Sequence, residues 1–359
     1  MRIALKECVW ESQGGDLFVI TDPREVVTLA DEEGQVAALF AALERGPCTA
    51  TELRERLAGA GVELAEADVR GAVEALDSLG LVECEADRTL GDPDLDARHF
   101  SNLAFFGTYA RLDRPRAEFV SRLRRSHVLV LGVGGGGSSV VQALAGLGVG
   151  RLTLVDRDEV EPRNFARQFL YHHADIGRSK VECAAAWVRD FDPEIEVRPV
   201  ERWISGPDDL KDLLDGVDLI AGGLDGHPDA NLWISDAAVR AGVPLVVGGI
   251  TRSEVVYYSV SPGRSACVRC DWSDRPSADE AGSGGFVERN RDRLALSNTL
   301  IGPLAMQIGS LVAYEALRYL TGFEEPRAAG TYIRLDLREG LVPALDPFTR
   351  DPDCPVCPK

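Results

Sequence analysis

The chain of 359 residues lacks features that would direct it to a membrane or to nucleic acid. No stretch reaches the ~18 uninterrupted apolar residues of a membrane-spanning helix, and residues 1–10 lack the apolar core of a signal peptide. Basic residues are few: 39 Lys and Arg against 58 Asp and Glu, a net charge of -19. Binding of a phosphate backbone needs a basic surface, so we expect no nucleic-acid partner. Without a signal peptide or a membrane-spanning segment, we expect a cytoplasmic protein with no membrane partner.

The remaining composition is typical of a globular protein, with 45% hydrophobic and 27% charged residues and no repeat of fixed period. At roughly 150 residues per domain, the length predicts about two domains. In the cytoplasm the eight cysteines are expected to stay reduced or to bind metal.

Residues 1–90 predict a small α+β domain of the winged-helix type. Short apolar runs, the last at Val26–Leu29, indicate strands separated by Gly and Pro turns. Three segments of helical periodicity follow, and Thr49 with Glu52 has the spacing of a capping box. Residues 91–126 are interpreted as a linker and lead-in helix.

The third predicted helix of this domain has too little positive charge to recognise DNA. Around its Arg70 it carries four acidic residues, Glu66, Asp68, Glu74 and Asp77. Two interpretations stay open for the domain. It is a purely structural cap, or it is a peptide clamp in which a leader peptide adds a strand beside Val26–Leu29 and packs on the third helix.

The rest of the chain, residues 127–359, predicts a doubly wound, Rossmann-like α/β sheet, because strands and helices alternate. A helix is expected at 230–241, between two of the later strands. A Gly- and Ser-rich acidic loop at 273–290 is interpreted as disordered, as a flexible cover over the site, or as both. A long apolar helix is expected at 298–320.

The glycines Gly132, Gly134 and Gly137 form a G-x-G-x-x-G pattern between a strand and a helix. Such glycines let the backbone approach phosphate groups at a helix N-terminus. Asp156 closes the second strand, where a carboxylate binds ribose hydroxyls. These residues alone fit an NAD-binding site as well as an ATP-binding site.

The segment after Asp156 favours a triphosphate, since several negative oxygens need cationic and amide donors. Its polar residues, which a dehydrogenase does not need, are Asp158, Asn164, Arg167, Gln168 and Lys180. Asp225 follows a later strand at the C-terminal edge of the sheet. A carboxylate there can hold Mg²⁺ beside the triphosphate.

In this order and spacing the motifs resemble those of the ThiF- and MoeB-like adenylyltransferases of the ubiquitin-activating superfamily, over residues 98–359. The resemblance implies ATP and Mg²⁺ as cofactors, with Asp156 on the ribose and Asp158 and Gln168 in the same nucleotide-binding set. It assigns the phosphates to Asn164, Arg167 and Lys180. Arg167, Lys180 and Asp225 are expected to carry the catalysis, with Asp225 as the magnesium ligand.

The resembling enzymes also use an arginine of the partner subunit to touch the triphosphate. Ser101 stands where their pattern has that arginine, so Arg98 is the substitute candidate. Together with the long apolar helix at 298–320, this predicts a homodimer.

Two C-x-x-C pairs, Cys267 with Cys270 and Cys354 with Cys357, predict a tetrahedral zinc site. Disulfides are the weaker interpretation for a cytoplasmic protein. The resembling family carries a pair at each place. Because four cysteines leave no position for a catalytic water, the expected role is structural. The loop at 271–297 contains no cysteine, so transfer through a thioester is not expected.

A peptide-binding domain joined to this catalytic fold resembles the enzymes of ribosomally made peptide natural products, above all the microcin C-type peptide-adenylating enzymes. The resemblance implies adenylation of a precursor peptide at its C-terminal carboxyl group or a side-chain amide, with release of pyrophosphate. Residues 1–90 would hold the leader. Two alternatives stay open. One is a non-catalytic leader-binding partner of an azoline-forming cyclodehydratase, and the other is a sulfur-carrier protein adenylyltransferase.

Overall fold

The computed structural model describes residues 1–224, 227–251, 253–273, 279, 282–290 and 300–357. The chain divides into two compact units, Met1–Arg122 and Leu123–Lys359. Each unit has its own buried apolar core. Among the helices within the described ranges, none combines the length and apolar character that a membrane crossing requires.

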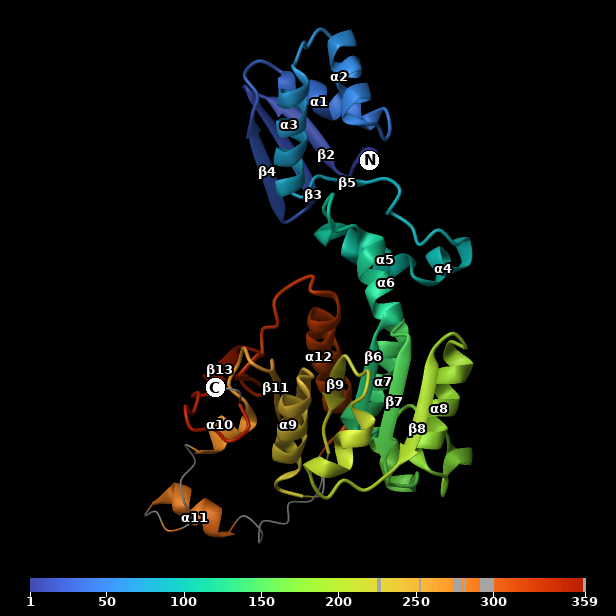
Figure 1. Ribbon diagram of the computed structural model, residues 1–359, viewed down its shortest axis with the longest axis vertical. Helices are drawn as coiled ribbons and strands as arrows, with labels where there is room; N and C mark the ends of the chain where they lie inside the picture. The colour runs from blue at the N-terminus through green and yellow to red at the C-terminus, as the bar shows by residue number, and fades with distance from the viewer. Residues whose placement is uncertain (225–226, 252, 274–278, 280–281, 291–299, 358–359) are drawn as a thin grey trace. The chain divides into compact units, whose positions relative to one another are not determined.

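The N-terminal unit contains two small antiparallel sheets (Figure 1). In one, β1 (Ile3–Leu5) pairs with β5 (Val82–Cys84). In the other, β3 (Asp16–Asp22) lies between β2 (Val9–Gln13) and β4 (Glu25–Ala30). The strand where the sequence predicts peptide addition, β4, is therefore at the edge of its sheet, with one side not paired within that sheet.

The helix that follows Thr49 begins where a local signal places it. The predicted capping box is confirmed: the Glu52 amide donates to Thr49 Oγ1 at 3.2 Å, and the Thr49 amide donates to Glu52 Oε2 at 2.8 Å. The apolar faces of the first three helices share one buried core, which includes the fully buried Phe40 of the first helix. The helices are α1 (Gln35–Glu44), α2 (Ala50–Gly59), α3 (Glu66–Ser78), α4 (Pro93–Arg98), α5 (Phe100–Tyr109) and α6 (Arg116–Arg125), which crosses the unit boundary.

The C-terminal unit is built on one eight-stranded sheet in the order β13-β12-β11-β10-β9-β6-β7-β8. Strands β8, β7, β6, β9 and β10 run parallel. From β6 the chain adds β7 and β8 on one side, and it then returns to add β9 and β10 on the other side of β6. The last three strands are antiparallel. The bounds are β6 (His127–Leu131), β7 (Arg151–Asp156), β8 (Glu196–Glu201), β9 (Leu219–Gly222), β10 (Leu245–Thr251), β11 (Glu254–Val260), β12 (Thr331–Asp336) and β13 (Pro343–Pro347).

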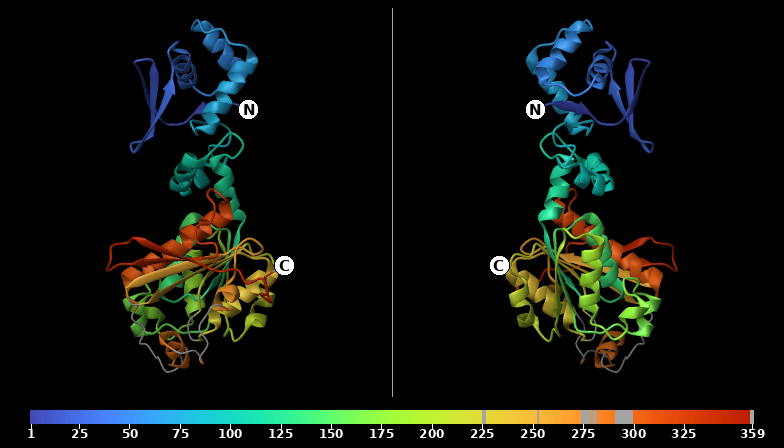
Figure 2. Two further views of the ribbon diagram at one scale, coloured as in Figure 1. Left: turned by 90° about the vertical axis from the view of Figure 1, so that its left-hand side faces the viewer. Right: turned by 90° about the vertical axis from the view of Figure 1, so that its right-hand side faces the viewer.

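Helices cover both faces of this sheet, so the predicted doubly wound α/β fold is confirmed (Figure 2). One group packs together on one face: α7 (Gly135–Leu147), α8 (Lys180–Phe191) and α12 (Gly302–Thr321). The second group is α9 (Ala230–Ala241), α10 (Val268–Ser273) and the 3-10 turn η3 (Pro207–Leu213). Short turns η1 (Pro162–Ala166) and η2 (His173–Asp175) and the helix α11 (Ser283–Asn290) complete the unit.

Two expectations about the chain after residue 270 need correction. The long helix begins at Gly302 rather than at residue 298, because Pro303 lacks an N–H and fits only the first turn; residues 298–299 themselves lie outside the described ranges. The acidic segment expected as a loop at 273–290 ends in the helix α11. Its residues 274–278 and 280–281 also lie outside the described ranges.

Candidate functional site

The loop after β6 places the N-terminus of α7 against the neighbouring strands. Gly132 has a φ of +77°, and a Cβ there would lie 2.6 Å from the carbonyl oxygen of Gly223 at the end of β9. A Cβ on Gly137 would overlap the carbonyl oxygen of Gly132. Gly134 is the N-cap residue of α7 and has no side chain to cover the first-turn amides. The first-turn amides can therefore donate hydrogen bonds to an anion, as the G-x-G-x-x-G pattern predicts.

Asp156 fixes the shape of this loop. Its Oδ2 accepts from the Val133 amide at 2.9 Å, and its Oδ1 accepts from the amides of Arg157 and Asp158 at 2.7 and 2.9 Å. The Val133 carbonyl in turn accepts from the buried Tyr171 hydroxyl at 2.6 Å, a contact that sequence reasoning missed. The carboxylate is thereby held at the end of β7 beside the glycine loop, where a ribose would lie.

Arg167 and Gln168, which directly follow η1, line the same glycine loop. The aliphatic carbons of Arg167 lie against Gly135, and the Gln168 amide nitrogen lies against Gly134. Gln168 is only 2% exposed, and its Oε1 has no hydrogen-bond partner among the residues described. A buried amide without a partner carries a desolvation cost that a polar ligand would remove. The loop and this amide therefore fit a bound nucleotide.

Asn164 and Lys180 are two further predicted site residues, and both are buried. Asn164 Oδ1 accepts from the Glu161 amide at 2.9 Å, which shapes η1. Lys180 begins α8, and its Nζ lies 2.9 Å from Asp158 Oδ2. Thus Asp156, Asp158, Arg167, Gln168 and Lys180 are brought to one edge of the sheet. Their individual contacts with a nucleotide stay predictions.

The roles of two further residues, Asp225 and Arg98, stay predictions. Asp225 lies outside the described ranges; Gly223, two residues before it, directly follows β9 and lies beside Gly132. Arg98 ends α4 in the N-terminal unit. Its predicted contact is made across a dimer and stays a prediction, as does the magnesium role of Asp225.

The four cysteines of the two C-x-x-C pairs converge within the C-terminal unit. Their sulfur atoms all lie within 4.8 Å of one another. Three of the separations are 3.7 Å for Cys267 to Cys270, 3.7 Å for Cys267 to Cys354, and 3.6 Å for Cys270 to Cys357. Zn–S bonds of ~2.3 Å in a tetrahedron put sulfurs about 3.8 Å apart. The cluster therefore fits a zinc ion with four thiolate ligands.

The helix α10, which follows Cys267 and contains Cys270, is tied to α9 by polar contacts that sequence reasoning missed. The Val268 amide donates to Ser235 Oγ at 3.3 Å. Arg269 Nε donates to the buried Asp236 carboxylate at 3.0 Å. No sequence signal connects residues 33 positions apart in this way. The contacts join the cysteine cluster to the helix α9, which packs in the core of the C-terminal unit.

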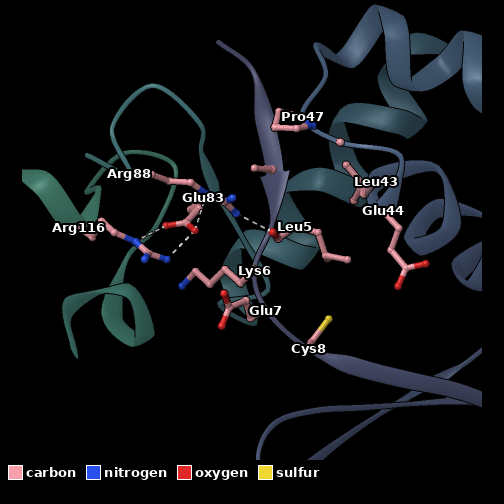
Figure 3. A pocket seen from close by; sticks show the side chains of 12 residues that line it. Leu5, Lys6, Glu7, Cys8, Leu43, Glu44, Pro47, Glu83, Arg88 and Arg116 are labelled. Carbon is pink, nitrogen blue, oxygen red and sulfur yellow. Dashed lines mark hydrogen bonds and ion pairs between the residues drawn. The ribbon is translucent and has the colours of Figure 1, made fainter. Parts of the chain in front are cut away.

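A pocket of about 350 Å³ opens in the N-terminal unit between β1, the end of α1 and β5 (Figure 3). On one wall the Glu83 carboxylate, 1% exposed, lies 2.8 Å from Arg88 Nε and 2.7 Å from Arg116 Nη2. Arg88 Nη2 also donates to the Leu5 carbonyl at 2.7 Å, and Lys6 Nζ donates to the Ala110 carbonyl at 2.7 Å. The Glu83 carboxylate thus pairs with two guanidinium groups, and these contacts tie β1 and β5 to the segments that follow them.

Comparison with known proteins agrees with this site. The ThiF family pattern matches residues 108–356. The SAMP-activating enzyme E1 of Haloferax volcanii is 32% identical over 68% of this chain and 85% of its own length. The sulfur carrier protein adenylyltransferase of Thermus thermophilus is 33% identical over 66% of this chain and 83% of its own length.

A solved structure shares the fold of the whole chain. It is the structure of E. coli MccB with AMPCPP and MccA, and its sequence is 18% identical to this chain. The TM-score is 0.77, and the match covers 100% of both chains. The family match and the two relatives decide the assignment, and the structural likeness extends the fold to the N-terminal unit. The chain belongs to the ThiF family, whose members are ATP-using adenylyltransferases.

Proposed function

We propose that this chain adenylates a carboxyl or amide group of a ribosomally made precursor peptide and releases pyrophosphate. The observation that supports the proposal is the likeness to MccB along the whole chain, N-terminal unit included. MccB is the microcin C7 biosynthetic enzyme and was solved with the peptide MccA. An adenylating fold that acts only on a sulfur carrier has no need of such a unit.

In the proposed reaction an oxygen of the peptide attacks the α-phosphorus of ATP, and the bond to pyrophosphate breaks. Catalysis of this kind is mostly positioning and charge neutralisation. The first-turn amides of α7 and the cations Arg167 and Lys180 would neutralise the phosphates, and the Asp156 carboxylate would hold the ribose. Magnesium, held by Asp225, would supply further positive charge at the triphosphate.

The N-terminal unit offers a route for holding the leader peptide. Strand β4 is the edge strand of its sheet and carries an exposed Val26, so an extended peptide can add to it as a further strand. We assign the leader-binding role to residues 1–90, with 91–126 as linker and lead-in and 127–359 as the adenylating domain.

The proposed functional form is a homodimer built on α12. One face of this helix is exposed and carries no charge, although the opposite face is buried against α7 and the sheet. That face consists of Pro303, Met306, Ser310 and Tyr314. In such a dimer Arg98 of the second subunit is the candidate to reach the triphosphate.

A sulfur-carrier substrate is the second candidate, because the sequence relatives at 30% identity or more include a sulfur carrier protein adenylyltransferase and an enzyme named as adenylyltransferase and sulfurtransferase. A non-catalytic delivery role is disfavoured by the nucleotide residues gathered at one edge of the sheet. These include the glycine loop, Asp156, Arg167, Gln168 and Lys180.

The test is ATP–pyrophosphate exchange with the purified full chain, given either a candidate precursor peptide or a sulfur-carrier protein. Peptide-dependent exchange that is lost in Arg167→Ala and Asp225→Ala, but kept in the exposed α8 variant Arg189→Ala, supports the proposal. Exchange only with the carrier protein establishes the second candidate. Tight peptide binding without exchange leaves a delivery protein.

A further inference from the structure

An exposed indole stands at the C-terminal edge of the parallel sheet. Trp203 follows β8 by two residues and is 42% exposed. The guanidinium carbon of Arg157 lies 3.4 Å from the centre of the Trp203 ring, so the two planes form a cation–π stack. Arg157 directly follows Asp156, the predicted ribose carboxylate, and its amide donates to that carboxylate.

The segment that carries Trp203 is held rigid by its neighbours. Arg202 donates to both oxygens of the Asp212 carboxylate at 2.6 and 2.9 Å and to the Asp209 carbonyl at 2.9 Å. The Ser205 amide and hydroxyl both donate to Asp209 Oδ2 at 2.8 Å. Next to the indole, Ile204 is buried in the core. The exposed ring is therefore presented by a fixed turn.

The order of the strands places this stack beyond the ribose. Neighbouring strands run β6, β7, β8 across the sheet, and their C-terminal ends carry the glycine loop, Asp156 and Trp203 in that order. Strands lie about 4.8 Å apart. A nucleotide with its phosphates at α7 and its ribose at Asp156 must extend its base toward β8, or turn away from the sheet altogether.

We propose that Trp203 and Arg157 form a base-stacking surface for the adenine of ATP and give the site its preference for purines. Delocalised rings and guanidinium planes stack on any base, but a purine covers more of the surface than a pyrimidine. This inference rests on nucleotide binding by the family fold. It does not depend on a peptide as the second substrate.

The test compares binding of ATP with binding of inorganic tripolyphosphate, which has no base, by calorimetry on the full chain. Since stacking contributes ~1–3 kcal/mol per base, Trp203→Ala should weaken ATP binding about 5- to 150-fold and leave tripolyphosphate binding unchanged. Trp203→Phe should retain most of the affinity. The preference for ATP and GTP over CTP and UTP should shrink in Trp203→Ala and in Arg157→Ala.

Trp187→Ala is the matched control, because this indole belongs to α8 and stacks there on Phe191. It should leave both ligands unaffected. Unchanged ATP affinity in Trp203→Ala would overturn the inference, and so would an equal loss of tripolyphosphate binding, which would place the effect in the phosphate loop. Because no peptide is present, failure of the peptide proposal would not alter either result.

Discussion

The ammonium group of Lys180 lies 2.9 Å from the Asp158 carboxylate, with the lysine side chain 6% exposed and the aspartate side chain 56% exposed. The Lys180 amide also donates to the Asp158 carbonyl at 2.9 Å, so the start of α8 is joined twice to the turn after β7. A buried ammonium needs a partner, and the carboxylate supplies one. A phosphate at the glycine loop would offer the same lysine a second anion.

We therefore expect Lys180→Ala to lower kcat for ATP–pyrophosphate exchange about 100-fold, the loss typical of removing one charged donor from a developing negative charge. Asp158→Asn should lower activity less, because it keeps the geometry but weakens the hold on the ammonium. The exposed Lys211→Ala, whose partner is Asp208, is the control and should behave as wild type. Equal activity of Lys180→Ala and Lys211→Ala would contradict this role.

Glu83 is the buried centre of the ion cluster in the N-terminal unit. Its carboxylate faces two guanidinium groups, Arg88 and Arg116. Glu83→Gln leaves these cations without their counter-charge, and we expect the free energy of unfolding to fall by about 3–5 kcal/mol. The measurement is urea unfolding of the full chain.

Glu85→Gln is a matched control for this change two residues away. Glu85 pairs with Arg2 in an exposed ion pair, so its loss should cost less than about 1 kcal/mol. A Glu83→Gln variant no less stable than Glu85→Gln would show that the cluster does not hold the unit together.

The cysteine cluster should bind one zinc ion per chain, measured by metal analysis of the purified protein. Cys354→Ser removes a ligand from the tail and should lower both the zinc content and the thermal midpoint of the C-terminal unit. Cys183→Ser changes a buried cysteine that lies outside the cluster and should leave the zinc content unchanged. Full zinc content in Cys354→Ser, or none in the wild type, would contradict the assignment.

Local signals allowed much of the fold to be predicted from the sequence. The capping box at Thr49 depends on residues three positions apart, and the helix expected at 230–241 between two strands has the observed bounds of α9. The glycine loop and the two C-x-x-C pairs are likewise short patterns with one dominant physical use. Each of these features is specified within about a dozen residues.

Features that join distant segments could not be predicted. The edge strands β8 and β13 were missed because β8 carries charges along its length and β13 begins and ends in proline, patterns that an edge strand tolerates. The Asp236–Arg269 and Glu83–Arg116 pairs link residues 33 positions apart in each case. Only the packing of elements brings such partners together.

Lys6 gives the N-terminal unit a distinctive pH dependence. Burial lowers the pKa of Lys6 to about 8, with Arg111 and Arg116 acting in the same direction and Glu83 and Asp77 opposing it. In the unfolded chain the group returns to its ordinary value of 10.5. Between these values the unfolded state binds more protons, so the contribution of Lys6 to stability rises with pH across this window.

The variant that isolates this effect is Lys6→Met, which keeps the stem and removes the titrating group. The free energy of unfolding of the wild type, minus that of Lys6→Met, should increase between about pH 8 and pH 10.5 and be flat below pH 7. Titration of the 13C-methylated lysines by NMR gives the pKa directly, with the exposed Lys211 as internal reference. A Lys6 resonance that titrates together with Lys211 would contradict the burial of a charged ammonium at this position.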